Sequence, residues 1–113
     1  MNLKEAVEQL DLRVLTGEDK LGNKVSFGYT SDLLSDVMAN SKEGNLWITL
    51  QTHQNIVAVA KLKDLAGIIF VNNRQPDEDT VKKAIEEKVP LLQSGETAYV
   101  VSGKLYQLMS RAD

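Results

Sequence analysis

The stretch Ala66-Gly67-Ile68-Ile69-Phe70-Val71 decides the fold, because it is a near-continuous apolar run between polar segments. Strands buried on both faces of a parallel sheet have this composition, whereas strands with one face in water alternate apolar and polar residues. Asn72-Asn73 follows, and asparagine is a typical turn residue. We therefore expect a strand that is buried on both faces of a sheet.

Upstream of this strand, helical and strand patterns alternate. From Leu3 to Leu10, apolar residues recur at i, i+3, i+4 and i+7, which predicts a short helix. The segment from Ile56 to Leu62 has the composition of a strand, but its i, i+3, i+4 spacing and the strand just beyond it favour a helix. Strands are expected over Arg13 to Leu15, Val25 to Tyr29 and Leu46 to Gln51, and a loop over Glu18 to Lys24. A further helix is expected to begin at Thr30-Ser31-Asp32 and to end near Asn40. Its buried face is Leu33, Leu34, Val37 and Met38.

The alternation continues downstream. Pro76-Asp77-Glu78-Asp79 begins a helix whose expected core face is Val81, Ala84 and Ile85, and Val89 to Leu92 predicts a short strand. Ser94 is expected to cap a last helix that carries Val101, Leu105 and Leu108. Such alternation predicts an α/β fold, with a mostly parallel sheet flanked by helices and right-handed crossovers. At 113 residues the chain is the size of one domain, which we expect to cover residues 1–113.

Composition excludes several classes of function. The chain has no cysteine, so it forms no disulfide, thiolate nucleophile or iron–sulfur site. Its net charge of −3 argues against general nucleic-acid binding, which needs a concentrated basic surface. No apolar run approaches the roughly 20 residues of a membrane span, and the charged start MNLKEAVEQL is unlike a signal peptide. We expect a cytoplasmic protein that binds neither nucleic acid nor membrane.

Motifs for catalysis are missing. His53 is the one histidine, so no transition-metal site and no cofactor is expected. Asp32 and Asp36 lie one helical turn apart and could hold magnesium, although a capping acid and a solvated acid explain them as well. Gly17 to Lys24 has the glycine spacing of a P-loop, but Asn23 stands where the lysine belongs. No Gly-X-Ser-X-Gly elbow supports a serine nucleophile. We therefore expect no catalysis.

Polar side chains concentrate where two predicted strands pass into helices. In open parallel sheets, ligands collect beyond the carboxyl ends of the strands, where helix amides point outward. If the two strands are neighbours, their loops meet at one edge and form a cleft in which Tyr29 is available for stacking. Ordinary capped turns need the same residue types. The candidate ligand-binding residues are Tyr29, Thr30, Ser31, Thr49, Gln51, Thr52, His53 and Asn55.

The same two loops carry a resemblance to a known family. The chain resembles small stand-alone bacterial DRTGG-domain proteins in several segments. These are residues 28–40, 46–53, 55–60 and 64–69, Pro76-Asp77-Glu78, and Val89 to Leu92. The resemblance covers roughly Leu10 to Leu108, although the pentapeptide Asp-Arg-Thr-Gly-Gly does not occur. It implies a fold similar to the amino-terminal domain of HPr kinase/phosphorylase, a regulatory role, adenine nucleotides as effectors, and self-association.

Two functions follow as hypotheses. The first is a homodimeric regulatory domain that binds a small anionic ligand, for example an adenine nucleotide, at the two loops. The second is an adaptor subunit without a small ligand, which docks on a redox or metabolic enzyme complex as its protein partner. Trp47, Phe27 and Met38 could belong to such a docking surface or to the core. An enzyme is the third and least favoured interpretation.

Overall fold

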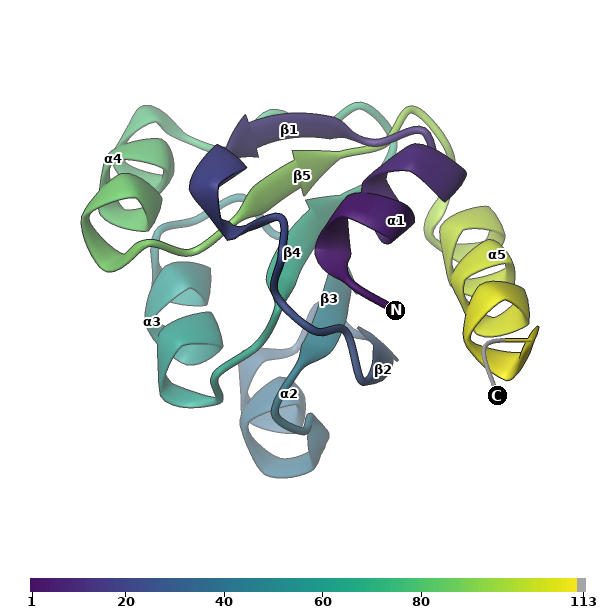
Figure 1. Cartoon of the computed structure of the whole chain (residues 1–113). Helices are drawn as coiled ribbons and strands as arrows, with labels where there is room; N and C mark the ends of the chain where they lie inside the picture. The colour runs from purple at the N-terminus through teal and green to yellow at the C-terminus, as the bar shows by residue number, and fades with distance from the viewer. Residues whose placement is uncertain (112–113) are drawn as a thin grey trace.

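The computed structural model describes residues 1–111 and contains one sheet with helices on both faces (Figure 1). The strands lie in the order β1-β5-β4-β3-β2. Strands β2 to β5 run parallel, and β1 pairs antiparallel with β5 at the edge of the sheet. The strands are β1 (Arg13–Thr16), β2 (Phe27–Thr30), β3 (Asn45–Thr49), β4 (Gly67–Phe70) and β5 (Leu91–Gln93). The predicted α/β class and mostly parallel sheet are confirmed.

Two separate cores fill the space between the sheet and its helices. In β4, Ile68 and Phe70 pack on one side, while Ile69 packs on the other. One core lies under α2 (Leu34–Asn40), α3 (Asn55–Leu62) and α4 (Glu78–Glu87). The other lies under α1 (Leu3–Gln9) and α5 (Ala98–Arg111). Figure 1 shows the two helical layers on opposite sides of the sheet.

The segment from Ile56 to Leu62, for which both a strand and a helix were considered, forms a helix. Residues Ile56 and Val57 are fully buried in α3, and Leu62 at its end is exposed. A right-handed crossover between parallel strands β3 and β4 requires such a connection, because neighbouring parallel strands cannot be joined by a tight turn. Tertiary topology thus decides against the strand that the composition allowed.

Two expected helix starts or caps are wrong, and one predicted loop contains a short helical turn. The helix predicted from Thr30 begins at Leu34 as α2, because Asp32 turns its carboxylate to the end of β3 instead of capping α2. Ser94 lies buried before α5, and Thr97 caps that helix by accepting a hydrogen bond from the Val100 amide. A 3-10 turn, η1 (Glu18–Lys20), occupies part of the predicted loop.

Two residues expected in the core are exposed. Leu33 precedes the first turn of α2, and Ile85 lies on the outer side of α4. Of the three residues suggested for a docking surface, Trp47 is fully buried in β3 and Met38 is half-buried. Phe27 is the exposed one. Among residues 1–111, no helix combines the length and the apolar character that crossing a bilayer needs.

Candidate functional site

The two loops with the predicted binding residues meet at one edge of the sheet. Strands β2 and β3 are parallel neighbours, and Thr30 pairs with Ile48 at their carboxyl ends. The Ser31 amide continues the ladder by donating to the Ile48 carbonyl at 3.2 Å. The expected convergence of the loops after β2 and β3 is confirmed.

Asp32 occupies the space in which these loops meet. Its carboxylate oxygen Oδ1 accepts a hydrogen bond from the Leu50 amide at 2.7 Å and another from the Thr49 hydroxyl at 2.8 Å. Its own carbonyl accepts from the Gln51 side-chain amide at 2.9 Å. A carboxylate from the chain itself therefore takes up the donors that an anionic ligand would use.

The other predicted residues also have partners within the fold. The Ser31 hydroxyl accepts from the Leu33 amide, and the Ser31 carbonyl accepts from the buried Trp47 indole at 2.8 Å. The Thr52 carbonyl accepts from the Thr80 hydroxyl, which ties this loop to α4. The loops are therefore braced against one another and against α4.

His53 and Asn55 lie at the start of α3 and remain exposed. Nδ1 of His53 accepts a long hydrogen bond of 3.4 Å from the Asn55 amide. Gln54 is the N-cap residue of α3, but its side chain makes no capping hydrogen bond. Of the predicted residues, these two keep the largest accessible surface together with Thr30.

Tyr29 and Thr30 point to opposite faces of the sheet, as consecutive residues of a strand must. The Tyr29 hydroxyl donates to Asp36 at 2.9 Å, and the ring packs against the core under α2. Tyr29 is therefore held against α2, and its hydroxyl is already engaged within the fold. The hydrogen bond to Asp36 raises the pKa of Tyr29 above its usual value of 10.0, and hydrogen bonds from Ser31, Tyr29 and Asn40 lower the pKa of Asp36 below 3.8.

Asp36 is consequently used for structure. Besides Tyr29, it accepts a hydrogen bond from the Asn40 side chain at 2.9 Å. Asp32 and Asp36 bind different partners, and the residues that the structure describes contain no cluster of three or more His, Cys, Asp or Glu side chains suited to a metal.

Thr30 lies on the other face, in a cavity between the free edge of β2 and helix α5. Its hydroxyl is 2.6 Å from that of Ser102. Phe27 and Tyr106 flank the opening with an edge-to-face contact, their ring centroids 5.8 Å apart. The cavity has a volume of about 180 Å³ and is lined by Phe27, Gly28, Thr30, Ile48, Ser102, Leu105, Tyr106 and Met109. We call it the β2–α5 cavity.

Sequence reasoning placed Thr30 in the candidate site but missed its neighbours Ser102, Tyr106 and Phe27. Thr30 and Ser102 are separated by 72 positions. No spacing rule connects a strand end with a helix that far along the chain. The helical pattern of α5 predicts which residues face inward, but not which strand they cover.

The charge at the carboxyl edge of the sheet is mainly negative. Asp32, Asp77, Glu78 and Asp79 follow strands β2 or β4 at this edge, where Arg74 contributes a positive charge, whereas Glu96 after β5 is paired with Lys104. This balance opposes the binding of a bare anion at the loops. The β2–α5 cavity has instead apolar walls and two hydroxyl groups.

Comparisons with known proteins define the fold further. No protein-family model matches the sequence, and no curated protein matches it. A solved structure of the CBS and DRTGG domains from the regulatory region of Clostridium perfringens pyrophosphatase, in complex with its activator diadenosine tetraphosphate, is similar, with a TM-score of 0.71 and 12% sequence identity. The match covers 94% of this chain and 46% of that one, so the chain spans under half the length of its relative. The fold of this chain is therefore similar to that of a region with CBS and DRTGG domains, which supports the DRTGG resemblance of the sequence.

Proposed function

We propose that this chain is a non-catalytic regulatory domain of the cytoplasm. It binds a small ligand by enclosing a flat apolar ring of that ligand in the β2–α5 cavity. An adenine nucleotide is the first candidate. The similar pyrophosphatase region supports a regulatory role, because that protein is complexed with an activator built from adenine nucleotides. The proposal depends on the β2–α5 cavity, the place where a predicted site residue lines an apolar hollow with polar groups.

The dimensions of the cavity limit what it can enclose. A volume of about 180 Å³ lies below the roughly 300–1,000 Å³ that surrounds a whole drug-sized ligand. It suits one ring system, with the rest of the ligand outside. Phe27 and Tyr106 offer aromatic contacts at the opening, and the Thr30 and Ser102 hydroxyls can exchange their mutual hydrogen bond for bonds to ring nitrogens.

The predicted residues Thr49, Gln51, Thr52, His53 and Asn55 form the competing site within this proposal. Thr49 and Gln51 are bound to Asp32, which disfavours an anion there, whereas His53 and Asn55 are free to contact a ligand at the rim. One set of variants separates the two sites, because the cavity and the loop after β3 share none of these residues.

The test is calorimetric titration with adenosine, AMP, ATP and diadenosine tetraphosphate. We expect saturable binding of at least one of them, weakened at least tenfold by Phe27→Ala and Ser102→Leu and unchanged by Thr52→Ala and His53→Ala. The reverse pattern would move the site to the loop after β3. No binding of any compound by the folded protein would overturn the ligand proposal.

The exposed apolar side chains of α5 favour the adaptor as a second candidate. Tyr99 is 88% exposed, and Tyr106, although it contacts Phe27, is 62% exposed. A stable complex with an enzyme subunit, recovered from the native host and lost in Tyr99→Glu, would support this function. The homodimer implied by the resemblance stays a prediction in both cases.

A further inference from the structure

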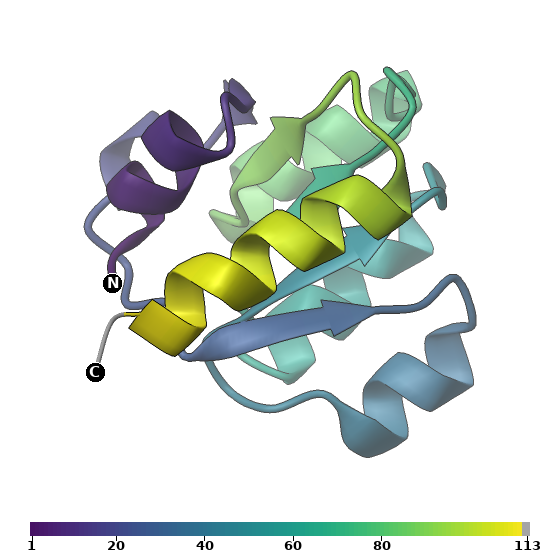
Figure 2. The same ribbon diagram turned by 90° about the vertical axis from the view of Figure 1, so that its right-hand side faces the viewer.

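The walls of the β2–α5 cavity carry no charged side chain. Figure 2 shows helix α5 lying beside strand β2, and the cavity opens between these two elements. None of its eight lining residues is Asp, Glu, Lys, Arg or His, and the buried side chains of Ile48 and Leu105 form its apolar base. The polar side-chain groups in the walls are the hydroxyls of Thr30, Ser102 and Tyr106. A ligand there meets hydroxyl groups and apolar atoms of the described residues, without a cation to neutralise a phosphate.

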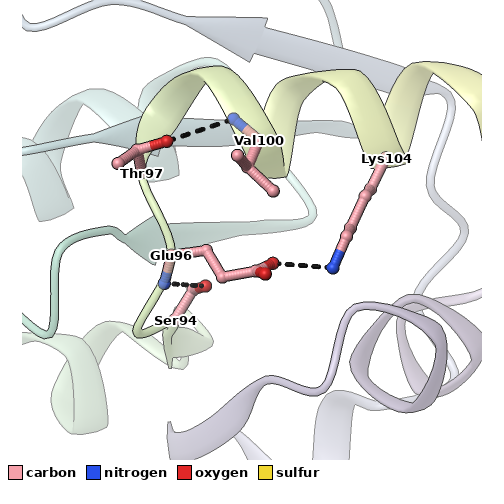
Figure 3. Close-up of polar contacts among 5 residues, drawn as sticks. All are labelled: Ser94, Glu96, Thr97, Val100 and Lys104. Carbon is pink, nitrogen blue, oxygen red and sulfur yellow. Dashed lines mark hydrogen bonds and ion pairs between the residues drawn. The ribbon is translucent and has the colours of Figure 1, made fainter.

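The cationic side chains of α5 lie away from the cavity. Lys104 and Arg111 are the two cations on this helix. At about 100° per residue, they lie about 200° and 180° around the helix axis from Ser102, which lines the cavity. Lys104 also forms an ion pair of 2.8 Å with Glu96 (Figure 3). Helix α5 therefore supplies no cation to a phosphate group at the cavity.

The charged residues that flank β2 do not favour a phosphate either. Asp32 follows Thr30 by two positions, so a carboxylate lies close to this end of the cavity. Lys24 precedes β2, but it lines a separate hollow together with Glu43 and Asp64. A phosphate group that leaves the cavity at the Thr30 end would approach the Asp32 carboxylate, which repels it.

The cavity also has no room to enclose a phosphate beside a ring. Its volume is about 180 Å³. Helix α5 rests directly on β2, because a Cβ atom added at Gly28 would lie 2.6 Å from Cδ2 of Leu105. The base of the cavity is therefore closed, and a phosphate stays outside in water. Repulsion between solvent-exposed charges is screened by salt, so the effect on affinity is modest and depends on ionic strength.

We propose that the β2–α5 cavity selects an uncharged heteroaromatic ligand, a nucleoside or a free nucleobase, over the corresponding nucleotide. This inference rests on the proposed function, because it takes the cavity as the ligand site, and it narrows the class of ligand. The Thr30 and Ser102 hydroxyls lie 2.6 Å apart, and each can donate or accept a hydrogen bond. Together they match a ring edge on which an amino group stands next to an acceptor nitrogen. Burial of the ring against the apolar base adds to the affinity.

Calorimetric titration of the whole chain with adenine, adenosine, AMP and ATP tests the selection. Adenosine should bind more tightly than AMP by about threefold or more, since an unfavourable pair of exposed charges changes affinity by roughly that factor. ATP should bind no more tightly than AMP. The difference should be larger at roughly 20 mM salt than at roughly 500 mM salt, where charges are screened within about 4 Å.

Three variants identify the origin of the selection. Asp32→Asn removes the carboxylate charge and should bring the dissociation constant of AMP closer to that of adenosine, which itself stays unchanged. Asp19→Asn removes one negative charge on η1 and is the matched control, so it should leave the ratio of the two constants unchanged. Glu96→Gln frees Lys104 from its ion pair and should also leave the ratio unchanged, because Lys104 lies away from the cavity.

The outcomes separate this inference from the proposed function. Tighter binding of AMP or ATP than of adenosine, lost in Ser102→Leu, would overturn the selection and leave the cavity as the ligand site. A gain in AMP affinity in Glu96→Gln would also overturn it, since Lys104 would then reach the phosphate. A preference for adenosine that Ser102→Leu leaves intact would place the selection elsewhere and refute it. Absence of binding of all four compounds to the folded protein would overturn the proposed function and this inference together.

Discussion

Replacing Asp32 by alanine tests whether this carboxylate holds the carboxyl edge of the sheet together. In the folded protein, its Oδ1 atom accepts hydrogen bonds from the Leu50 amide and from the hydroxyl of the buried Thr49. Asp32→Ala removes this acceptor and with it both hydrogen bonds. The Thr49 hydroxyl is then left without its acceptor inside the protein, whereas water can reach the half-buried Leu50 amide.

The expected loss follows from these contacts. A hydrogen bond to a charged partner contributes about 1.5–3 kcal/mol, and the exposure of Asp32 places each of the two bonds at or below the low end of that range. We expect Asp32→Ala to lower the free energy of unfolding by about 2 kcal/mol. For a domain of this size that corresponds to roughly 8 °C in melting temperature. Asp32→Asn keeps one acceptor oxygen and should cost less than half as much.

Urea denaturation followed by tryptophan fluorescence is a suitable assay. Trp47 is the single tryptophan, it is fully buried, and its indole donates to the Ser31 carbonyl beside Asp32. Circular dichroism of the same samples reports the helices. Asp19→Ala, at an exposed acid on η1, is the control for the loss of one negative charge. A loss below about 0.5 kcal/mol for Asp32→Ala, or an equal loss for the control, would refute the proposed role.

Two further predictions concern a titration and a turn. Tyr29 should titrate above pH 10.0 by ultraviolet absorption when the other two tyrosines are replaced by phenylalanine, because its hydroxyl donates to Asp36. The stability that this bond provides is present below pH 10.0 and is lost as the pH rises through the pKa of Tyr29 in the folded protein. Above that pKa, Tyr29→Phe and the wild type should have the same free energy of unfolding. Gly17→Ala should cost more than about 1 kcal/mol in thermal unfolding, since φ is +86° and the new Cβ would lie 2.7 Å from Cα of Pro90, whereas Gly22→Ala meets nothing within 4 Å and should be neutral.

The candidate site shows where local reasoning works and where it ends. The loops after β2 and β3 were expected to meet, and they do, because the carboxyl ends of adjacent parallel strands lie at the same edge. The expected role of Asp32 as a helix cap was wrong. Its carboxylate binds Thr49 and Leu50, which lie on a different strand and its loop. A capping acid and a bridging acid look identical in the sequence.

Patterns within a few residues determined much of this protein by themselves. The apolar run at Ala66 to Val71 and the alternation of helical and strand periods predicted an α/β fold with a mostly parallel sheet, because burial on one or both faces leaves a period that neighbouring residues record. The absence of cysteine excluded thiol chemistry directly.

The tertiary structure alone decided the strand order, the antiparallel edge strand β1 and the β2–α5 cavity. Each of these depends on which distant segments become neighbours. Thr30 and Ser102 meet across 72 positions of chain, and no local propensity encodes such a contact. It arises from the global packing of helices on a sheet, where burying all apolar faces together selects one arrangement.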